Sequence, residues 1–309
     1  MTMPLVSIVV PVYNAAPFVA ETIESLLRQD YKSLEIILID DGSTDDSLTI
    51  LQRYAESCLV LTQENQGQSA TLNRGWALAR GSFLGYLSAD DTFEPGAVRC
   101  VVEALQAEPA AILAYPDFWL IDDQSRRFRE VSAPPFDYED MLLNGICQVG
   151  PGMLFRRTAF ERAGGWNQVL RQIPDYEFLL RLGLQGAGVH VPLRLAGLRV
   201  HDQSQSFAIA DTPRVMEHLT VINDYYARDD IPPAYRQARP QAVANAYMLM
   251  SRAHLRARRY RAAMANFWYA LVMYPPVLVH RRTWRLLANA LVYKILHHLR
   301  VRAVKGDCS

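Results

Sequence analysis

The sequence predicts an α/β fold: a mostly parallel sheet flanked by helices, followed by an all-helical C-terminal extension. Over about the first 90 residues, strand-length apolar runs alternate with segments whose apolar residues recur at helical spacing. Several of these runs end in acidic or small polar residues. After residue 212 the sequence becomes rich in Ala, Arg, Leu and Tyr at helical spacing. We therefore expect two domains, residues 1–212 and 213–309.

The elements of the first domain follow in order. Buried strands are expected where apolar, mostly β-branched residues run together, at 5–12, 34–39, 58–62 and 82–87. Helices are expected between and after them, at 17–29, 44–54, 69–79 and 98–107. Further strands are expected at 111–121 and 152–156, further helices at 158–163 and 175–184, and short edge strands at 189–192 and 198–201. The second domain should contain helices at 216–226, 242–255, 261–273 and 282–299.

The charges are unevenly distributed, although the formal net charge is zero. From Ile231 to the end there are 14 Lys or Arg and one acid, a balance of +13, so the remainder carries 18 − 31 = −13. The four cysteines are far apart and form no CxxC pair, which argues against a disulfide framework or zinc site and favours a reducing compartment. We expect no signal peptide and no membrane-spanning helix, and hence a cytoplasmic protein.

Carboxylates follow two of the predicted strands. Asp40 and Asp41 end the second, and Asp90 and Asp91 come just after the fourth, while Tyr13 ends the first. Open α/β sheets bind ligands at this edge, and adjacent carboxylates repel unless a cation or hydrogen-bond donors offset them. The alternative is that Asp90 and Asp91 turn the chain and cap a helix that starts near Thr92.

Several nucleotide-handling classes are excluded. The first strand is not followed by GxGxxG, and GxxxxGK[ST] does not occur, which argues against a dinucleotide dehydrogenase and a P-loop nucleotidase. The first strand is not followed by a Gly-rich basic loop, which argues against a sugar nucleotidyltransferase. Outside these classes, the sequence has no nucleophile elbow, which argues against a hydrolase with a Ser-His-Asp triad.

Seven segments in order resemble the family-2 glycosyltransferases, which have the GT-A (Rossmann-like) fold, over about residues 5–206. They are VSIVVPVYN, LEIILIDDGSTDDS, ENQGQSATLNRG, GSFLGYLSADDTFEPGAV, MLFRRTAFERAGGW, PDYEFLLRLG and LRVHDQSQS. The resemblance implies transfer of a sugar from a nucleotide-diphosphate donor, most simply a UDP-sugar, to an acceptor hydroxyl with inversion.

The resemblance also implies which residues bind the nucleotide: Pro11, Tyr13, Asp41, Asn73 and Asp90. Tyr13 would stack on the base, a contact worth about 1–3 kcal/mol. The alternative is that its ring packs in the core. Asp41, or Asp40, would accept a base N–H, and the alternative is that one of them caps a helix starting at Thr44.

The same resemblance implies a divalent cation, Mg²⁺ or Mn²⁺, held by Asp91 and His201, and a catalytic base, Asp175. Burial or the charge of Asp91 would raise the pKa of Asp175, and a helix N-terminus would lower it. Alternatively, Asp175 only stabilises or caps the N-terminus of its helix. The alternative for His201 is a structural role without contact to the metal or the diphosphate.

Five positions depart from the family pattern. Ser88 stands where many members have a further acid, Leu72 where many have Arg, Pro174 where many have Glu, and Asn167-Gln168 where many have Asp-Glu. The first bears on metal binding, and the others bear on donor and acceptor preference.

The implied product is a cell-surface glycan or lipid-linked oligosaccharide, made from a glycan or lipid-linked acceptor on the cytosolic side of a membrane. The competing hypothesis is a non-catalytic nucleotide- or glycan-binding module. Aromatic residues such as Trp268 and Tyr269 lie among the C-terminal arginines, which favours a peripheral position on an anionic membrane at its inner face. Alternatively, the aromatics form the core of the helical domain. No nucleic-acid partner is expected, because the first domain is acidic.

Overall fold

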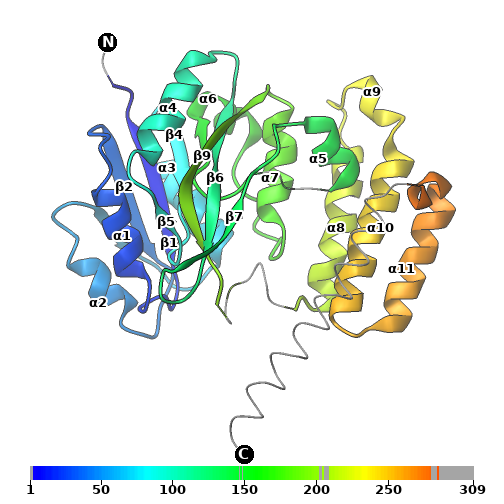
Figure 1. Ribbon diagram of the computed structural model, residues 1–309, viewed down its shortest axis with the longest axis horizontal. Coiled ribbons are helices and arrows are strands. Elements are labelled where there is room, and N and C mark those ends of the chain that lie inside the picture. Colours follow the sequence, from blue (N-terminus) through cyan, green and yellow to red (C-terminus); the bar gives the residue numbers. More distant parts are fainter. Residues whose placement is uncertain are drawn as a thin grey trace, which may run out of the picture. The chain divides into compact units, whose positions relative to one another are not determined.

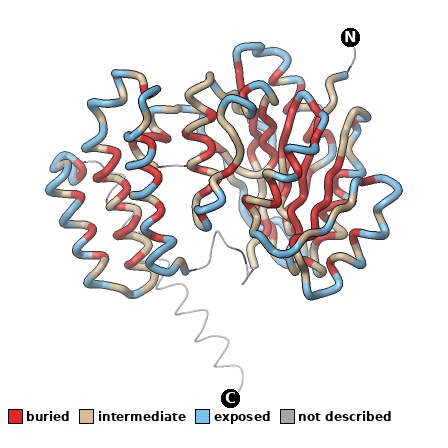
Figure 2. Tube along the Cα trace, turned by 180° about the vertical axis from the view of Figure 1, so that it is seen from behind, coloured by how far each residue is buried: buried red, intermediate tan, exposed pale blue. Residues whose placement is uncertain are grey.

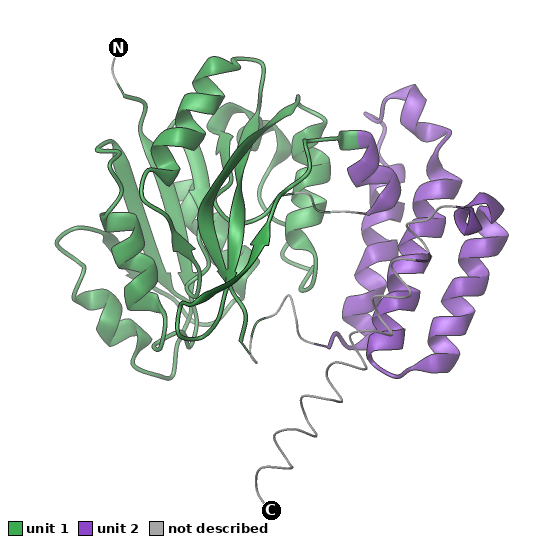
Figure 3. Ribbon diagram, viewed as in Figure 1, with its two compact units in different colours: residues 1–138, 147–204 green, residues 139–146, 205–309 purple. Residues whose placement is uncertain are grey.

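The computed structural model describes residues 3–145, 147, 149–201, 204, 209–279 and 284. The chain divides into two compact units, shown in different colours in Figure 3. Unit 1 comprises residues 1–138 and 147–204, and unit 2 comprises residues 139–146 and 205–309. Residues 139–146, in the middle of the first predicted domain, thus belong to unit 2.

Unit 1 is built on a sheet that has nine strands among the described residues, in the order β3-β2-β1-β4-β8-β6-β9-β5, with β7 paired to β6. The strands are β1 (Val6–Val12), β2 (Leu34–Asp40), β3 (Leu59–Thr62), β4 (Phe83–Tyr86), β5 (Thr92–Phe93), β6 (Leu113–Ile121), β7 (Arg127–Val131), β8 (Leu154–Arg156) and β9 (Gly188–Arg199). Helices flank this sheet (Figure 1). The predicted α/β fold is confirmed.

The first four strands are parallel, as predicted. β1 lies between β2 and β4, with Val12 opposite Asp40 and Val9 opposite Tyr86. All seven residues of β1 are buried, and the central strands of unit 1 are largely red in Figure 2. Because parallel strands end at the same edge, the residues that follow β1, β2 and β4 come together.

The second half of the sheet differs from the prediction. β8, β5 and β7 each pair antiparallel to a neighbour. The two expected edge strands at 189–192 and 198–201 are instead one strand, β9, which pairs with β6 along its length. The prediction was wrong because bulges beside Asp117 let the ladder continue through residues 193–197.

The helix expected at 98–107 is confirmed as α4, but Thr92 and Pro95 do not start it. Thr92 and Phe93 form β5, opposite Gly197 and Ala196 of β9. The helix α4 begins only at Ala97. The helices of unit 1 are α1 (Val19–Leu27), α2 (Ser47–Gln52), α3 (Gln68–Leu78), α4 (Ala97–Ala107), α6 (Arg157–Ala163) and α7 (Pro174–Gly183).

Unit 2 is helical in its described part. Its elements are α5 (Tyr138–Asn144, whose first residue belongs to unit 1), α8 (Thr212–Tyr226), α9 (Pro233–Arg236), α10 (Arg239–Arg256), α11 (Tyr260–Met273) and the 3-10 helix η1 (Pro275–Leu278). Asp211 caps α8 by accepting a hydrogen bond from the Arg214 N–H at 2.9 Å. The helix expected at 282–299 lies outside the described residues, apart from Trp284. No helix in the described part of the chain combines the length and hydropathy needed to span a bilayer.

Candidate active site

The ends of β1 and β2 are joined by hydrogen bonds that place Tyr13 beside Asp41. The Asp41 N–H donates to the Val12 carbonyl at 2.7 Å. Asn14, at a positive φ of 49°, accepts from the Thr44 N–H at 2.8 Å. Pro11 is buried within β1, whereas Tyr13 is 52% exposed. The ring of Tyr13 therefore does not pack in the core, and it remains open to a ligand.

Asp41 is buried and holds the loop that leads into α3. Its carboxylate accepts from the Gln66 N–H at 2.9 Å, the Gly67 N–H at 2.8 Å and the Gln63 side chain at 2.8 Å. Asp40 receives two longer contacts on Oδ2, and its buried Oδ1 has no partner in the described part of the chain. Neither acid caps α2, which begins at Ser47.

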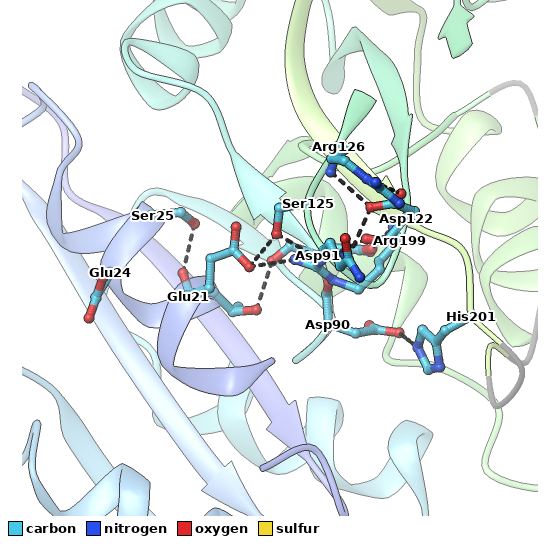
Figure 4. Close-up of polar contacts among 12 residues, drawn as sticks. Glu21, Glu24, Ser25, Asp90, Asp91, Asp122, Ser125, Arg126, Arg199 and His201 are labelled. Carbon is cyan, nitrogen blue, oxygen red and sulfur yellow. Dashed lines mark hydrogen bonds and ion pairs between the residues drawn. The ribbon is translucent and has the colours of Figure 1, made fainter. Parts of the chain in front are cut away.

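Asp90 and Asp91 follow β4 in a turn that is held from α1. The Thr22 hydroxyl lies 2.9 Å from the Ala89 carbonyl and 2.7 Å from the Asp91 carbonyl. Asp91 Oδ1 accepts from the backbone N–H of Arg199 at 2.8 Å, and Asp90 Oδ2 lies 2.9 Å from Nε2 of His201 (Figure 4). No side chain caps α4, which starts after Gly96, so these acids do not cap a helix.

Arg199, the last residue of β9, was not identified from the sequence. Its side chain is fully buried, and its Nε–H donates to the Asp90 carbonyl at 2.7 Å. The guanidinium also forms an ion pair with Glu21 at 2.7 Å and donates to the Ser125 hydroxyl at 2.9 Å (Figure 4). One buried cation thus braces the acidic turn against α1 and the loop after β6. The only sequence signal was its place in LRVH, next to the predicted His201.

The acidic pair suits a hard divalent cation. Burial, and then the negative charge of Asp90, raise the pKa of Asp91 well above its usual range, although Arg199 opposes this. A bound cation would relieve that repulsion. Among the described residues there is no cluster of three or more His, Cys, Asp or Glu placed to hold a metal. Two carboxylates nevertheless fit Mg²⁺ or Mn²⁺, which usually take one or two carboxylates and complete their coordination with substrate phosphates.

Asp175 lies in the first turn of α7, as predicted. Its carboxylate is 3.9 Å from the Cys147 thiol. Burial raises the pKa of Asp175, while hydrogen bonds from the N–H groups of Tyr176 and Asp175 and from the thiol lower it by less. The two opposing effects expected from the sequence are both present, and burial prevails. A carboxyl with a raised pKa is a stronger base once it is ionised.

The pKa of Tyr86 is affected by burial and by the charges of Asp175 and Asp91. Burial raises its pKa well above the ordinary value, and the charges of Asp175 and then Asp91 add to that effect. The ring of Tyr86 packs edge-on against Trp166, with centroids 5.2 Å apart. Tyr86, the last residue of β4, is a second site residue that the sequence analysis missed.

Asn73 holds the turn that contains Trp166. Its Nδ2 donates to the Trp166 carbonyl and its Oδ1 accepts from the Trp166 N–H, both at 2.8 Å. The neighbouring Gly165 is required, because a Cβ there would lie 2.2 Å from Asn73 Oδ1. Asn73 thus positions the turn that supports Tyr86. Its expected contact with the donor stays a prediction.

Comparison with known sequences gives one family. The model of glycosyl transferase family 2 matches residues 7–164. Chondroitin synthase of Escherichia coli is 29% identical over 230 residues, which is 73% of this chain and 33% of that protein. Two further curated relatives are matched over 57% and 65% of their length, so the chain spans less than two thirds of these relatives.

Solved structures share the fold. Residues 1–349 of S. aureus TarS, in complex with UDP-GlcNAc, superpose with a TM-score of 0.64 at 14% identity, covering 85% of this chain and 89% of that one. A mannosyltransferase from Pyrobaculum calidifontis, in complex with GDP-Man and Mn²⁺, gives 0.58 at 19% identity, covering 96% and 88%. At these identities the likeness concerns the fold alone.

Proposed function

The chain belongs to glycosyl transferase family 2, and from this we propose that it transfers a sugar from a nucleotide-diphosphate donor to an acceptor hydroxyl with inversion. The observation that carries the proposal is the gathering of Tyr13, Asp41 and the pair Asp90–Asp91 at the ends of three adjacent parallel strands. Ligands of open α/β sheets bind at this edge.

The donor would be bound at the β1 and β2 ends. The exposed ring of Tyr13 is available to stack on the base. A base N–H is proposed to be accepted by Asp41, whose carboxylate already holds the loop before α3, or by Asp40, whose Oδ1 has no partner in the described part of the chain. We propose UDP as the nucleotide and a hexose or N-acetylhexosamine as the sugar. The UDP-GlcNAc complex of TarS supports this choice, whereas the mannosyltransferase complex contains GDP-Man.

The acidic turn would hold the cation, with Asp91 and His201 as proposed ligands and Asp90 directed to the ribose or the metal. Mg²⁺ or Mn²⁺ bound there would supply Lewis-acid stabilisation of the diphosphate leaving group. Arg199 holds the Asp91 carboxylate through its backbone N–H and the backbone of Asp90 through its side chain, by donating to Asp91 Oδ1 and to the Asp90 carbonyl. His201 orients Asp90 through their 2.9 Å contact.

Asp175 is proposed to remove the proton from the acceptor hydroxyl as that oxygen attacks the anomeric carbon, so that the C–O bond to the acceptor forms while the bond to the diphosphate breaks. The raised pKa of its carboxyl suits a general base. Tyr86, whose pKa is raised by burial and by the charges of Asp175 and Asp91, is proposed to lie between the base and the leaving group.

The acceptor is proposed to be a growing glycan or a lipid-linked oligosaccharide at the cytosolic face of a membrane. The likeness to a chondroitin synthase supports a polysaccharide product. A peripheral position at the membrane is part of this proposal, because it would bring the enzyme to a lipid-linked acceptor.

A panel of nucleotide sugars tests the proposal. The purified chain would be incubated with each donor and Mn²⁺, and release of nucleoside diphosphate would be measured with and without candidate acceptors. One donor is expected to stand out and to require the cation. Nucleotide binding detected by calorimetry without any turnover would favour the non-catalytic binding module instead. The absence of both turnover and nucleotide binding would contradict the proposal.

A further inference from the structure

The outer face of α11 is apolar and exposed. Met264, Trp268 and Val272 follow one another at four-residue spacing and are 72%, 64% and 62% exposed. Tyr260, Tyr269 and Met273 extend the same face, and Leu278 and Val279 continue it past the helix. Residues four apart lie above one another on a helix, so these side chains form one continuous strip.

This strip is distinct from the side of α11 that packs inside unit 2. Ala263, Asn266 and Ala270 of α11 are buried, and Ala270 belongs to a small core with Met248 and Val277. The sequence left open whether the aromatic residues form the core of the helical domain. For Trp268 and Tyr269 that alternative is wrong. Their exposure requires a different explanation, because large apolar strips on a protein surface usually mark a binding site.

The segment that contains the strip carries charges of one sign. Between Ile231 and Val279 there is no Asp or Glu, and the arginines are Arg236, Arg239, Arg252, Arg256, Arg258, Arg259 and Arg261. Arg258 and Arg261 are exposed at the N-terminal end of the strip. An apolar aromatic face beside basic side chains is the pattern of helices that lie in the interface of anionic membranes.

A groove continues the apolar surface from α11 onto its neighbours. It has a volume of about 400 Å³ and is lined by Leu219, Asn223, Arg239, Pro240, Val243, Tyr247 and Met273. Tyr247 packs against Tyr269 of the strip, with ring centroids 5.3 Å apart. The groove thus has apolar walls and one cation, Arg239, which suits part of an acyl chain and its phosphate.

We propose that the outer face of α11, with Trp268 at its centre, binds the surface of an anionic lipid bilayer. A second copy of the chain fits less well. A symmetric dimer through this face would bring together two copies of the strip with the arginines at its end, and α11 carries no acid that could pair with them. Anionic headgroups supply the complementary charge, and the bilayer interface accepts aromatic side chains.

The test is flotation of the full chain with two kinds of vesicle, phosphatidylcholine alone and phosphatidylcholine mixed with phosphatidylglycerol. The wild-type protein should float with the anionic vesicles and dissociate as NaCl is raised. The double variant Met264→Asp, Trp268→Asp should bind them at least about tenfold more weakly, because it places two anions where apolar groups insert. Arg261→Gln should bind more weakly only at low salt.

The matched control adds the same two charges elsewhere. Phe128 and Val169 are exposed apolar residues of unit 1, at 56% and 84% exposure. The variant Phe128→Asp, Val169→Asp should keep the binding of the wild type. Because all four positions are exposed, both double variants should keep the wild-type melting temperature. A loss of vesicle binding at an unchanged melting temperature would therefore reflect the changed surface and not unfolding.

Three results would overturn the proposal. The wild type could fail to float with anionic vesicles, or float equally with both kinds. The α11 variant could bind as well as the control variant. Finally, the wild type could be a dimer in light scattering and the α11 variant a monomer with unchanged flotation, which would make a second copy the partner of this face. These results bear on the peripheral membrane position proposed above, on which this inference builds, and not on sugar transfer, which the nucleotide-sugar panel tests separately.

Discussion

The backbone N–H of Arg199 donates to Oδ1 of Asp91 at 2.8 Å, while Nε of the same residue donates to the Asp90 carbonyl at 2.7 Å. One residue therefore fixes the side chain of one acid and the backbone of the other. Its guanidinium is in turn held by Glu21 of α1. The geometry of the proposed cation site thus depends on a contact between β9 and the turn after β4.

Replacing Arg199 by Met should lower the free energy of unfolding by roughly 3 kcal/mol, because it breaks a buried ion pair. This value is the lower end of the range for such a change, since Glu21 is partly exposed and water can solvate it after the replacement. The replacement should also weaken Mn²⁺ binding. Urea unfolding and calorimetry with Mn²⁺ alone would measure the two effects. Arg99→Met breaks an exposed pair with Asp30 and should cost less than about 1 kcal/mol. A similar loss in both variants would refute the bracing role.

Asp91→Asn should raise the melting temperature of the metal-free protein at neutral pH. The pKa of Asp91 is raised in the folded state, so the folded protein loses stability as the pH rises and this carboxyl ionises. An amide does not ionise, and its oxygen can still accept from Arg199. The gain should shrink as the pH is lowered, because the wild-type carboxyl is then protonated.

The same variant should lose the stabilisation that Mn²⁺ gives the wild type, since one proposed ligand is gone. Thermal scans with and without Mn²⁺ measure both effects. Asp46→Asn, at the start of α2, serves as a control that should change neither. An unchanged response of Asp91→Asn to Mn²⁺ would remove Asp91 from the cation site.

Tyr13→Ala should weaken binding of the nucleotide by about 1–3 kcal/mol, the value of a base–aromatic stack, and leave the melting temperature nearly unchanged. The reason is that the ring is half exposed and contributes little to the core. Tyr13→Phe should bind as the wild type does. Titration calorimetry with UDP decides the matter, and equal affinities for all three proteins would show that the ring does not stack on the base.

Asn73→Ala separates two roles for this amide. If Asn73 holds the turn at Trp166, losing two hydrogen bonds to buried backbone should cost about 1–3 kcal/mol of folding stability. Affinity for UDP should then fall by no more than a few fold. A large loss of affinity without loss of stability would instead support the direct contact with the donor that the sequence predicts.

The sequence predicts the parallel half of the sheet well, and with it the meeting of Tyr13, Asp41 and Asp90. The reason is that each buried strand is a local apolar run, and parallel strands must end at one edge. The residues at the strand ends can therefore be identified from the sequence as those that directly follow each apolar run. Asp175 is similarly visible as an acid in the first turn of an amphipathic helix.

What supports these residues could not be predicted from local patterns. Arg199 reaches Glu21 across 178 positions and Asp90 across 109, and nothing near Arg199 in the sequence indicates either partner. The pairing of Asn73 with Trp166 spans 93 positions. β9 was mistaken for two edge strands because its pairing with β6 is interrupted opposite Asp117, where β9 carries extra residues that the ladder skips, between Val191 and Ala196.

The pH dependence of turnover should reflect Asp175. Burial raises its pKa, and the base must be ionised to accept a proton, so kcat should fall on acidification through a midpoint above that of an ordinary aspartate. Removing the Cys147 thiol with Cys147→Ala takes away a hydrogen bond to the ionised form and should shift that midpoint further upward. A profile unmoved by this change would argue that Asp175 does not control it.

Asp175→Asn is the most direct test of the account. The amide nearly matches the carboxylate in shape but cannot take a proton, so turnover with the best donor should fall by about 10²–10⁴-fold. Binding of the nucleotide should stay within a few fold of the wild type, because Tyr13, Asp41 and the acidic turn are unchanged. Paired measurements of kcat and of UDP affinity on this variant decide the question. Lost turnover with retained binding supports Asp175 as the base of a glycosyltransferase, and turnover that survives the substitution contradicts it.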